Sequence, residues 1–284
     1  MQNPPQAAMQ VSNLSATLAF LTETLGFTLL EERPDEDFAY MCDSDGDSWM
    51  VAGPGVQDIP SYLSAPKFVA KPGESLAFGN RDLDTWQAEL SRKGVPDIEV
   101  SQRQLGDRVL SVKGPDNYTF QFIQAAEHSF EELLSLYARS SDDVDEALRG
   151  LSDDDMSLAL SDNTWNIRQI VHHICDTDIL FGEHMKVALS ASGATMESHT
   201  PVGNERISVQ PEYRERPVAS SLAFSRAFHA YILDIVKYIP DAGEHFIEDN
   251  NGRKHTFNQF LHLSVGHTGE HIEEIQKIRR KYGK

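Results

Sequence analysis

The sequence predicts a two-domain α+β protein in which a paired βαβββ cradle precedes a four-helix bundle. Three observations support this prediction. The chain has 284 residues, which is long for one compact domain and comfortable for two. All 11 histidines lie at or after residue 128. The spacing of apolar residues changes from alternation to helical periodicity near the same point. We therefore expect one domain over residues 1–126 and a second over residues 127–284.

The first domain is predicted to contain two copies of one structural module. In each copy a strand and a helix are followed by three more strands, so the order β-α-β-β-β occurs twice. The predicted helices, Leu14–Leu25 and Asp82–Lys93, are each followed by a glycine, which readily terminates a helix. The predicted strands are Ala7–Val11, Phe27–Glu32, Phe38–Cys42 and Ser48–Ala52 in the first copy, and Ser75–Phe78, Ile98–Gln102, Arg108–Val112 and Tyr118–Ile123 in the second.

The second domain shows helical periodicity instead. Apolar residues recur at spacings of three and four in four segments, which predicts four amphipathic helices packed as a bundle. The predicted helices are Phe130–Leu148, Trp165–Leu189, Pro217–Ile239 and Thr256–Lys281. The connection from Ser190 to Arg216 is irregular, and a connection of that length is more often a functional lid or a crossover than filler.

The composition limits the classes of partner. The formal net charge is −19 at pH 7, and such a field repels phosphate, so we expect neither nucleic acid nor membrane as a partner. No apolar run approaches the roughly 20 residues that span a bilayer. Residues 1–10 carry no secretory signal, so we expect a cytoplasmic protein. Cys42 and Cys175 fall in different predicted domains and are expected to remain thiols.

Three histidines fall on the apolar stripes of two predicted helices. His267 and His271 lie one turn apart on one face of the fourth helix. His173 faces inward on the second helix, whereas His172 is rotated from it by about 100°. Burying an imidazole without a partner costs free energy, and one divalent cation bound by three ring nitrogens would satisfy all three. The sequence therefore predicts a metal site made by His173, His267 and His271.

Two carboxylates lie about one helical turn from these histidines. Asp176 and Glu270 could each orient an imidazole or act as a general base, so both are candidate catalytic residues. The alternative for each is an exposed carboxylate on a helix surface. The spacing His267-x-x-Glu270-His271 also fits the motif of inverted zinc proteases. That class needs a much larger two-lobed scaffold, which a four-helix bundle of this length does not supply.

The order of short segments in the first domain resembles the vicinal oxygen chelate family, which includes glyoxalase I, ring-cleaving dioxygenases and bleomycin-resistance proteins. The matching pieces are Val11-Ser12-Asn13-Leu14, Phe20, Leu25-Gly26-Phe27, Phe78, Asp82-Leu83 and Gly114-Pro115-Asp116-Asn117. Metal-using members carry their ligands at positions that correspond to Gln6, Ser75 and Gln121. Serine is a weak ligand, and two amides leave a dication without a carboxylate, so no cofactor is expected in this domain.

The same resemblance implies a cradle-shaped sheet, and two interpretations of it remain open. The concavity is either filled and used for dimer contacts, or it holds an organic ligand. In the second case Tyr40, Trp49 and Phe78 are expected to line it. A homodimer is compatible with both interpretations, since single modules of this type commonly pair.

The second domain resembles the DinB/YfiT-like family of metalloproteins. The match consists of Trp165-Asn166-Ile167-Arg168-Gln169, His172-His173 and Asp176, followed by the pair His267 and His271. This resemblance implies an up-down-down-up bundle and a three-histidine site that usually holds zinc or nickel. It also implies kinship with hydrolase-like proteins and with S-transferases that use small cellular thiols.

Two functions therefore follow from the sequence. The first is a metal-dependent enzyme, a hydrolase or a thiol transferase, that acts on an electrophilic small molecule in detoxification. The sequence favours an enzyme over a binding protein and leaves both functions open. The alternative is a non-catalytic protein of the resistance type, in which the first domain sequesters a small molecule.

Overall fold

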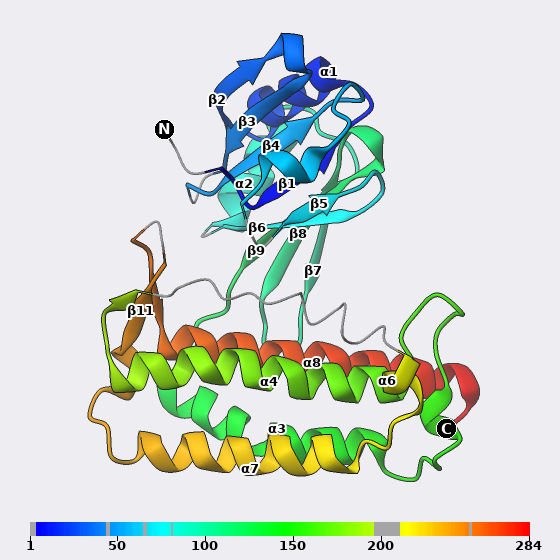
Figure 1. The fold of residues 1–284 in the computed structure, drawn as a ribbon, viewed down its shortest axis with the longest axis vertical. Coiled ribbons are helices and arrows are strands. Elements are labelled where there is room, and N and C mark those ends of the chain that lie inside the picture. Colours follow the sequence, from blue (N-terminus) through cyan, green and yellow to red (C-terminus); the bar gives the residue numbers. More distant parts are fainter. Residues whose placement is uncertain (1–3, 44–45, 65–66, 81, 196–210, 250–251) are drawn as a thin grey trace. The chain divides into compact units, whose positions relative to one another are not determined.

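The computed structural model describes residues 4–43, 46–64, 67–80, 82–195, 211–249 and 252–284. The chain divides into two compact units, with the boundary between Ala126 and Glu127 (Figure 1). Strands dominate the first unit and helices dominate the second. The predicted fold class, a strand-rich cradle followed by a four-helix bundle, is confirmed.

The first module of the N-terminal unit forms a five-stranded sheet in the order β2-β3-β4-β1-β5. Its strands are β1 (Ala7–Gln10), β2 (Thr28–Arg33), β3 (Phe38–Cys42), β4 (Ser48–Ala52) and β5 (Phe68–Ala70). The predicted helix is observed as α1 (Leu14–Ala19) continued by a π-helical turn, Phe20–Thr24. Strand β5 was not predicted, because three residues are too few to show a periodicity.

The second module forms a four-stranded sheet in the order β6-β9-β8-β7. Its elements are β6 (Ser75–Gly79), α2 (Leu83–Arg92), β7 (Glu99–Gln102), β8 (Arg108–Lys113) and β9 (Thr119–Gln124). In the first module β1 pairs in parallel with both β4 and β5, and in the second module β6 pairs in parallel with β9. The remaining pairs of both modules are antiparallel. The predicted internal duplication is therefore present in the strand pairing.

The aromatic residues expected to line a concavity pack instead against other apolar side chains. Trp49 is 6% exposed and belongs to the hydrophobic core that both modules share. Phe78 packs against the same core, with its ring centroid 6.1 Å from that of Trp49. Tyr40 packs against a smaller cluster that contains Phe38. The prediction that Trp49 lines an open ligand site is therefore wrong.

The C-terminal unit contains four long helices, α3 (Phe130–Leu148), α4 (Ile167–Ser190), α7 (Ala219–Val236) and α8 (Phe257–Tyr282). Helices α3 and α4 each pack against both α7 and α8 (Figure 1). Among the described residues, no helix is both long and apolar enough to cross a membrane.

Local sequence signals explain where these helices begin. Helix α4 starts after Asn166, whose side chain accepts from the backbone of Gln169 while the Gln169 side chain accepts from Asn166 N. Helix α8 has the same reciprocal cap between Thr256 and Gln259. Such capping boxes satisfy backbone N–H groups that a helix leaves without partners. They fix the register of the two helices that carry the predicted metal ligands.

A small sheet and one short helix were not predicted from the sequence. The sheet consists of β10 (Ala194–Thr195), β11 (Phe246–Glu248) and β12 (Lys254–Thr256), and the helix is α6 (Pro211–Glu215). Strand β10 and helix α6 lie within the connection that was expected to be irregular. The rest of that connection, residues 196–210 with His199, lies outside the described residues.

Candidate metal centre

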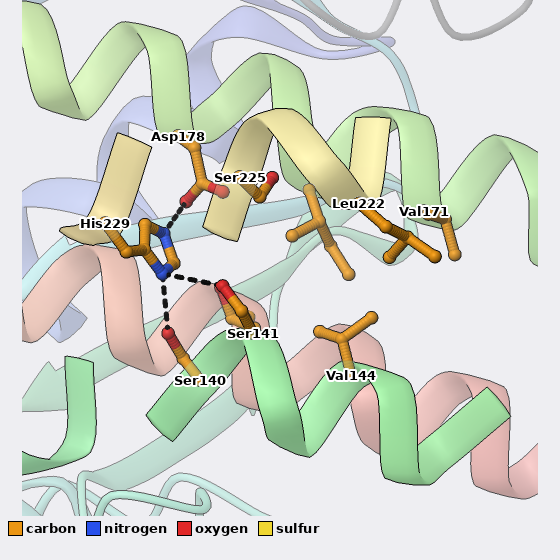
Figure 2. A pocket seen from close by; sticks show the side chains of 10 residues that line it. Ser140, Ser141, Val144, Val171, Asp178, Leu222, Ser225 and His229 are labelled. Atoms are coloured by element: carbon orange, nitrogen blue, oxygen red, sulfur yellow. Dashed lines mark hydrogen bonds and ion pairs between the residues drawn. The ribbon is translucent and has the colours of Figure 1, made fainter. Parts of the chain in front are cut away.

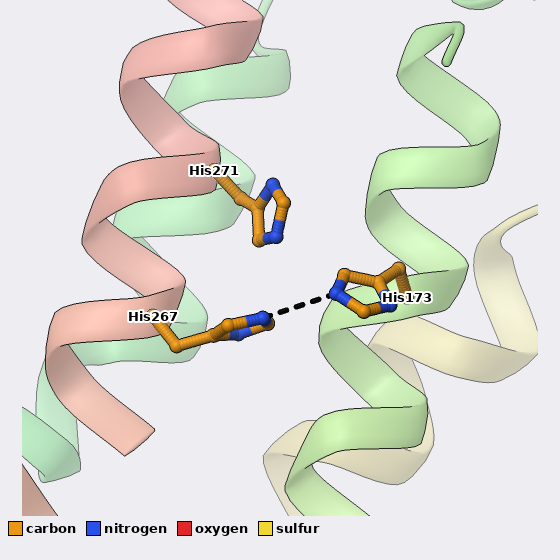
Figure 3. A group of neighbouring side chains, drawn as sticks. All are labelled: His173, His267 and His271. Atoms are coloured by element: carbon orange, nitrogen blue, oxygen red, sulfur yellow. Dashed lines mark hydrogen bonds between the residues drawn. The ribbon is translucent and has the colours of Figure 1, made fainter. Parts of the chain in front are cut away.

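Three imidazoles from two helices meet at one point of the bundle. Helix α4 contributes His173, and helix α8 contributes His267 and His271 (Figure 3). The Nε2 atoms of His173 and His267 are 3.0 Å apart. One ring nitrogen from each of the three lies within 4.8 Å of the others. The structure thus brings together the histidines that the sequence singled out.

The side-chain pattern of α8 explains why the group is partly open. The core-facing residues around the pair are Thr268 and Ile272, at 2% and 9% exposure. His267 and His271 each precede one of these positions and are only half-buried. They therefore lie at the border of the apolar stripe, whereas the sequence analysis had placed them on the stripe itself. This placement leaves one side of the group accessible, whereas His173 is 8% exposed.

Burial disfavours the protonation of two of these imidazoles. Burial lowers the pKa of His173 to about 4, with a smaller contribution from His271. Burial likewise lowers the pKa of His267 to about 3, with further lowering by His271 and His173. An unprotonated imidazole nitrogen has a lone pair that a divalent cation can bind. The donor set therefore fits a metal ion.

Aromatic rings surround the imidazole group. The centroid of the Trp165 ring lies 4.6 Å from that of His173 and 6.1 Å from that of His271. The Phe181 ring lies 6.3 Å from that of His267. Apolar walls of this kind exclude water and strengthen electrostatic interactions inside a site.

One carboxylate contacts the group, and the sequence analysis did not single it out. Glu274 Oε2 lies 3.1 Å from Nδ1 of His271, one turn further along α8. The spacing of three residues was a usable signal for this contact. Glu270 carried the same signal relative to His267, and spacing alone could not choose between them.

The two predicted catalytic carboxylates lie outside the imidazole group. Among the described residues, the one group of three or more His, Cys, Asp or Glu that could share a cation contains only the three histidines. The Tyr213 hydroxyl lies 3.1 Å and 3.3 Å from the two carboxylate oxygens of Asp176. Burial raises the pKa of Asp176, and the hydrogen bond from Tyr213 offsets this only in part. Glu270 is exposed on the surface of α8.

The neighbouring His172 is turned toward other partners. Its Nδ1 lies 2.9 Å from the hydroxyl of Ser221, and its Nε2 lies 3.1 Å from the carbonyl oxygen of Arg216. Both ring nitrogens are therefore engaged away from His267 and His271, as the helix periodicity had suggested.

A different buried histidine belongs to a second polar cluster in the bundle (Figure 2). His229 on α7 is 4% exposed, and its Nε2 lies 3.0 Å from the Asp178 carboxylate on α4. Its Nδ1 lies 3.0 Å from the hydroxyl of Ser141 and 3.2 Å from that of Ser140, both on α3. This cluster links three helices. The sequence analysis did not identify it.

The positions that correspond to a metal site in the N-terminal unit are Gln6, Ser75 and Gln121. The β6–β9 register pairs Ser75 with Thr119 and Ala77 with Gln121, so Ser75 and Gln121 share one face of the sheet. Ser75 and Gln6 are exposed, and Gln121 is half-buried. None of the three carries a charge that would offset the desolvation of a dication.

Comparisons with known proteins assign a separate family resemblance to each unit. Residues 136–275 match the family model of the DinB superfamily. Residues 4–122 match the model of the glyoxalase/bleomycin resistance protein/dioxygenase superfamily. Both resemblances inferred from the sequence are confirmed.

Similar individual proteins are distant in sequence. A protein of Oceanobacillus iheyensis, named as a candidate metal-dependent hydrolase, is 23% identical over 133 residues, which cover 46% of this chain and 74% of the relative. YfiT from Bacillus subtilis, described as a probable metal-dependent hydrolase with an unusual four-helix bundle topology, is 19% identical. It covers 56% of this chain and 92% of its own, with a TM-score of 0.49. Lactoylglutathione lyase from Agrobacterium tumefaciens is 14% identical and covers 44% and 95%, with a TM-score of 0.35.

Proposed function

We propose that the C-terminal domain, which matches the DinB superfamily, is a metal-dependent enzyme that acts on an electrophilic small molecule. His173, His267 and His271 would hold one divalent ion. The observation that carries the proposal is the convergence of three ring nitrogens within 4.8 Å. The relative that is named as a candidate metal-dependent hydrolase supports it.

Zinc or nickel suits this donor set best. Imidazole nitrogen is a preferred ligand of both metals, and three protein ligands with an accessible side are typical of catalytic rather than structural zinc. When bound, the ion would supply Lewis acidity, which lowers the pKa of a water molecule or a small thiol. Attack by water corresponds to a hydrolase, and attack by a low-molecular-weight thiol corresponds to a transferase.

The protein side chains supply the remaining functions of such a site. Trp165 and Phe181 restrict water, and the half-buried His267 and His271 border the side from which a small substrate can approach. Asp176 is held by Tyr213 and has a raised pKa, which brings a carboxyl closer to the range useful for proton transfer. We therefore retain Asp176 as the candidate general base and assign no catalytic role to Glu270.

The match of residues 4–122 favours a second candidate function, the sequestration of a small organic molecule by the N-terminal domain. In that case the bundle would be a partner domain. The two functions predict different results for metal content and for ligand binding, and one set of proteins separates them.

The experiment compares the wild-type chain with a His267→Ala/His271→Ala variant and with a His262→Ala control. His262 lies on the same helix outside the imidazole group. After expression in minimal medium with added zinc or nickel, the wild type and the control should carry about one metal ion per chain, and the double variant none. Hydrolysis and thiol-transfer assays on activated electrophiles should follow the metal content. A metal-free wild type that binds ligands through residues 1–126 would instead establish the second function.

A further inference from the structure

Neighbouring side chains decide which ring nitrogen of each histidine carries the hydrogen. A histidine can offer only one ring nitrogen to a shared cation, so the other nitrogen must find a different partner. For His271 that partner is Glu274, with Oε2 3.1 Å from Nδ1. The two side chains are 16% and 29% exposed, so water competes only weakly for this contact.

The chemistry of the contact fixes the tautomer of His271. An ionised carboxylate can only accept a hydrogen bond, so Nδ1 must donate and therefore carries the proton. The lone pair of the neutral ring is then on Nε2, the nitrogen that remains for His173 and His267. Because both residues lie on α8 one turn apart, the helix itself holds the carboxylate in place.

We propose that Glu274 is the positioning residue of the metal centre, which orients His271 and adds a negative charge beside the cation. This inference rests on the proposed function, because it assumes that the three imidazoles share a metal ion. Glu274 contacts no reacting atom and is not a catalytic residue. It acts through His271 as carboxylates do in carboxylate–histidine–zinc arrangements.

The chain offers a matched control on the same helix. Glu270 stands in the same relation to His267 as Glu274 does to His271, three residues further along α8. It is exposed on the surface of the helix. A general effect of negative charge on α8 would appear in variants of both residues, whereas a positioning effect appears in only one.

The test measures zinc affinity in the full chain by competition with a chromophoric chelator. Glu274→Ala removes both the acceptor and the charge and should weaken zinc binding about 10- to 100-fold. Glu274→Gln keeps an acceptor oxygen but no charge, so its loss should be smaller. Glu270→Ala and Glu270→Gln should bind zinc like the wild type.

A second readout follows the geometry of the site rather than its affinity. Cobalt(II) bound in place of zinc gives visible absorption bands that depend on ligand orientation. These bands should shift in Glu274→Ala and remain unchanged in Glu270→Ala. If Glu274→Ala does not fold, the affinity and the spectrum of Glu274→Gln decide in its place.

The outcomes separate this inference from the proposed function. A wild-type chain that binds neither zinc nor cobalt overturns both. A wild-type chain that binds zinc, together with Glu274 variants that match the Glu270 variants in affinity and spectrum, overturns only the role of Glu274.

An independent observation lies in the second polar cluster. Asp178 is 3% exposed, and its Oδ2 atom has no hydrogen-bond partner among the described residues. A cavity borders it and offers about 10 Å³ to the centre of a water molecule, which is roughly what one water needs. Asp178, Ser225 and Thr268 are among the residues that line the cavity.

We infer that this cavity binds a single water molecule that donates a hydrogen bond to Asp178 Oδ2. A buried carboxylate oxygen without a donor is costly, and the lining hydroxyls of Ser225 and Thr268 can complete the bonding of one water. The Ser141–His229–Asp178 series resembles a nucleophilic triad in composition. A cavity of this size admits no organic substrate, so it is a hydration site and not a second reaction centre.

A high-resolution crystal structure of the full chain, grown with thallium(I) as a heavy monovalent ion, tests this inference. We expect a density peak within hydrogen-bond distance of Asp178 Oδ2 that has no anomalous signal. An anomalous peak there would identify a cation site instead. An empty cavity, or a protein donor on Oδ2, would also overturn the inference.

Discussion

The two histidine clusters of the bundle share helix α4 but differ in the groups that surround their imidazoles. His173 meets two other imidazoles from α8. His229 meets the carboxylate of Asp178, which lies further along α4. A buried imidazole beside an acid has a partner for its proton and a source of opposite charge. Three imidazoles whose ring nitrogens converge can direct their lone pairs at one point, and this convergence makes the first cluster suited to a cation.

The two clusters of buried polar side chains also serve different purposes. The Asp178–His229 cluster links three helices through contacts between their side chains, so its contribution is to stability and to the register of the bundle. The three-histidine group lies at the border of an apolar stripe, and the lowered pKa values of His173 and His267 show that protonation is costly there. Imidazoles that resist protonation keep a ring lone pair available, which is what metal binding requires.

The largest expected effect tests the structural side of the comparison. Asp178→Asn removes the charge that faces His229, and we expect it to lower the free energy of unfolding by about 3–5 kcal/mol. Urea unfolding followed by circular dichroism measures the loss. The folded variant should still carry one metal ion per chain.

The matched change on the other side is His173→Ala. It removes one of the three converging imidazoles, so we expect loss of the metal together with a smaller change in metal-free stability, about 1 kcal/mol. The comparison would break if the two variants lost equal stability, or if folded Asp178→Asn protein lost its metal.

A pH titration of the metal-free chain has the next largest expected effect. The pKa of His173 is about 4 and that of His267 about 3 in the folded chain, against 6.5 for an ordinary histidine. Between the folded and the unfolded pKa values, the unfolded chain binds more protons than the folded chain. The free energy of unfolding should therefore be highest above about pH 6.5 and fall as the pH drops through 4 toward 3. The loss is on the order of 3 kcal/mol for His173 and 5 kcal/mol for His267.

Urea unfolding at a series of pH values checks this expectation, with a His173→Ala variant as the control. The control should show a shallower dependence on pH, because one of the depressed groups is absent. Parallel curves for the two proteins would show that His173 does not resist protonation.

Most of what places the metal centre could be read from the sequence, because the signals are local. The pair His267 and His271 is visible as a spacing of four within a helical pattern, and the helix face selects His173 over His172. The cap at Thr256 marked the start of the helix that carries the pair. Such signals depend only on residues within a few turns of one helix.

Other features could not be predicted, for physical reasons that differ. Asp178 and His229 meet only when α4 and α7 pack, so no spacing along the chain announces the pair. Glu270 and Glu274 have equivalent spacing from a histidine, and only the orientation of each side chain distinguishes them. Strands β5, β10, β11 and β12 are too short to show a period.

A smaller effect is expected at Asp176, which belongs neither to the Asp178–His229 cluster nor to the three-histidine group. Tyr213→Phe removes the hydroxyl that donates to this carboxylate, so the pKa of Asp176 should rise further above its ordinary value. Carbon-13 NMR titration of the carboxyl group measures the shift. The stability cost should be about 1 kcal/mol. An unchanged titration would show that Tyr213 does not hold the candidate base.

The smallest effects decide how His229 carries its protons. The hydroxyl of Ser140 lies 2.8 Å from the Tyr137 carbonyl oxygen and donates to it. The Ser140 oxygen can therefore only accept from His229 Nδ1, whereas the Ser141 hydroxyl can donate or accept. We therefore expect His229 Nδ1 to carry a hydrogen that the two serine oxygens share.

Ser140→Ala and Ser141→Ala should then each cost about 0.5–1 kcal/mol in urea unfolding, and the double variant should cost more than their sum, because the last acceptor is lost. If Nδ1 carried no hydrogen, only Ser141 could be bonded to it. In that case Ser140→Ala would leave stability unchanged, and nitrogen-15 NMR would show no hydrogen on Nδ1. The bridge from α3 to α7 through His229 would then depend on Ser141 alone.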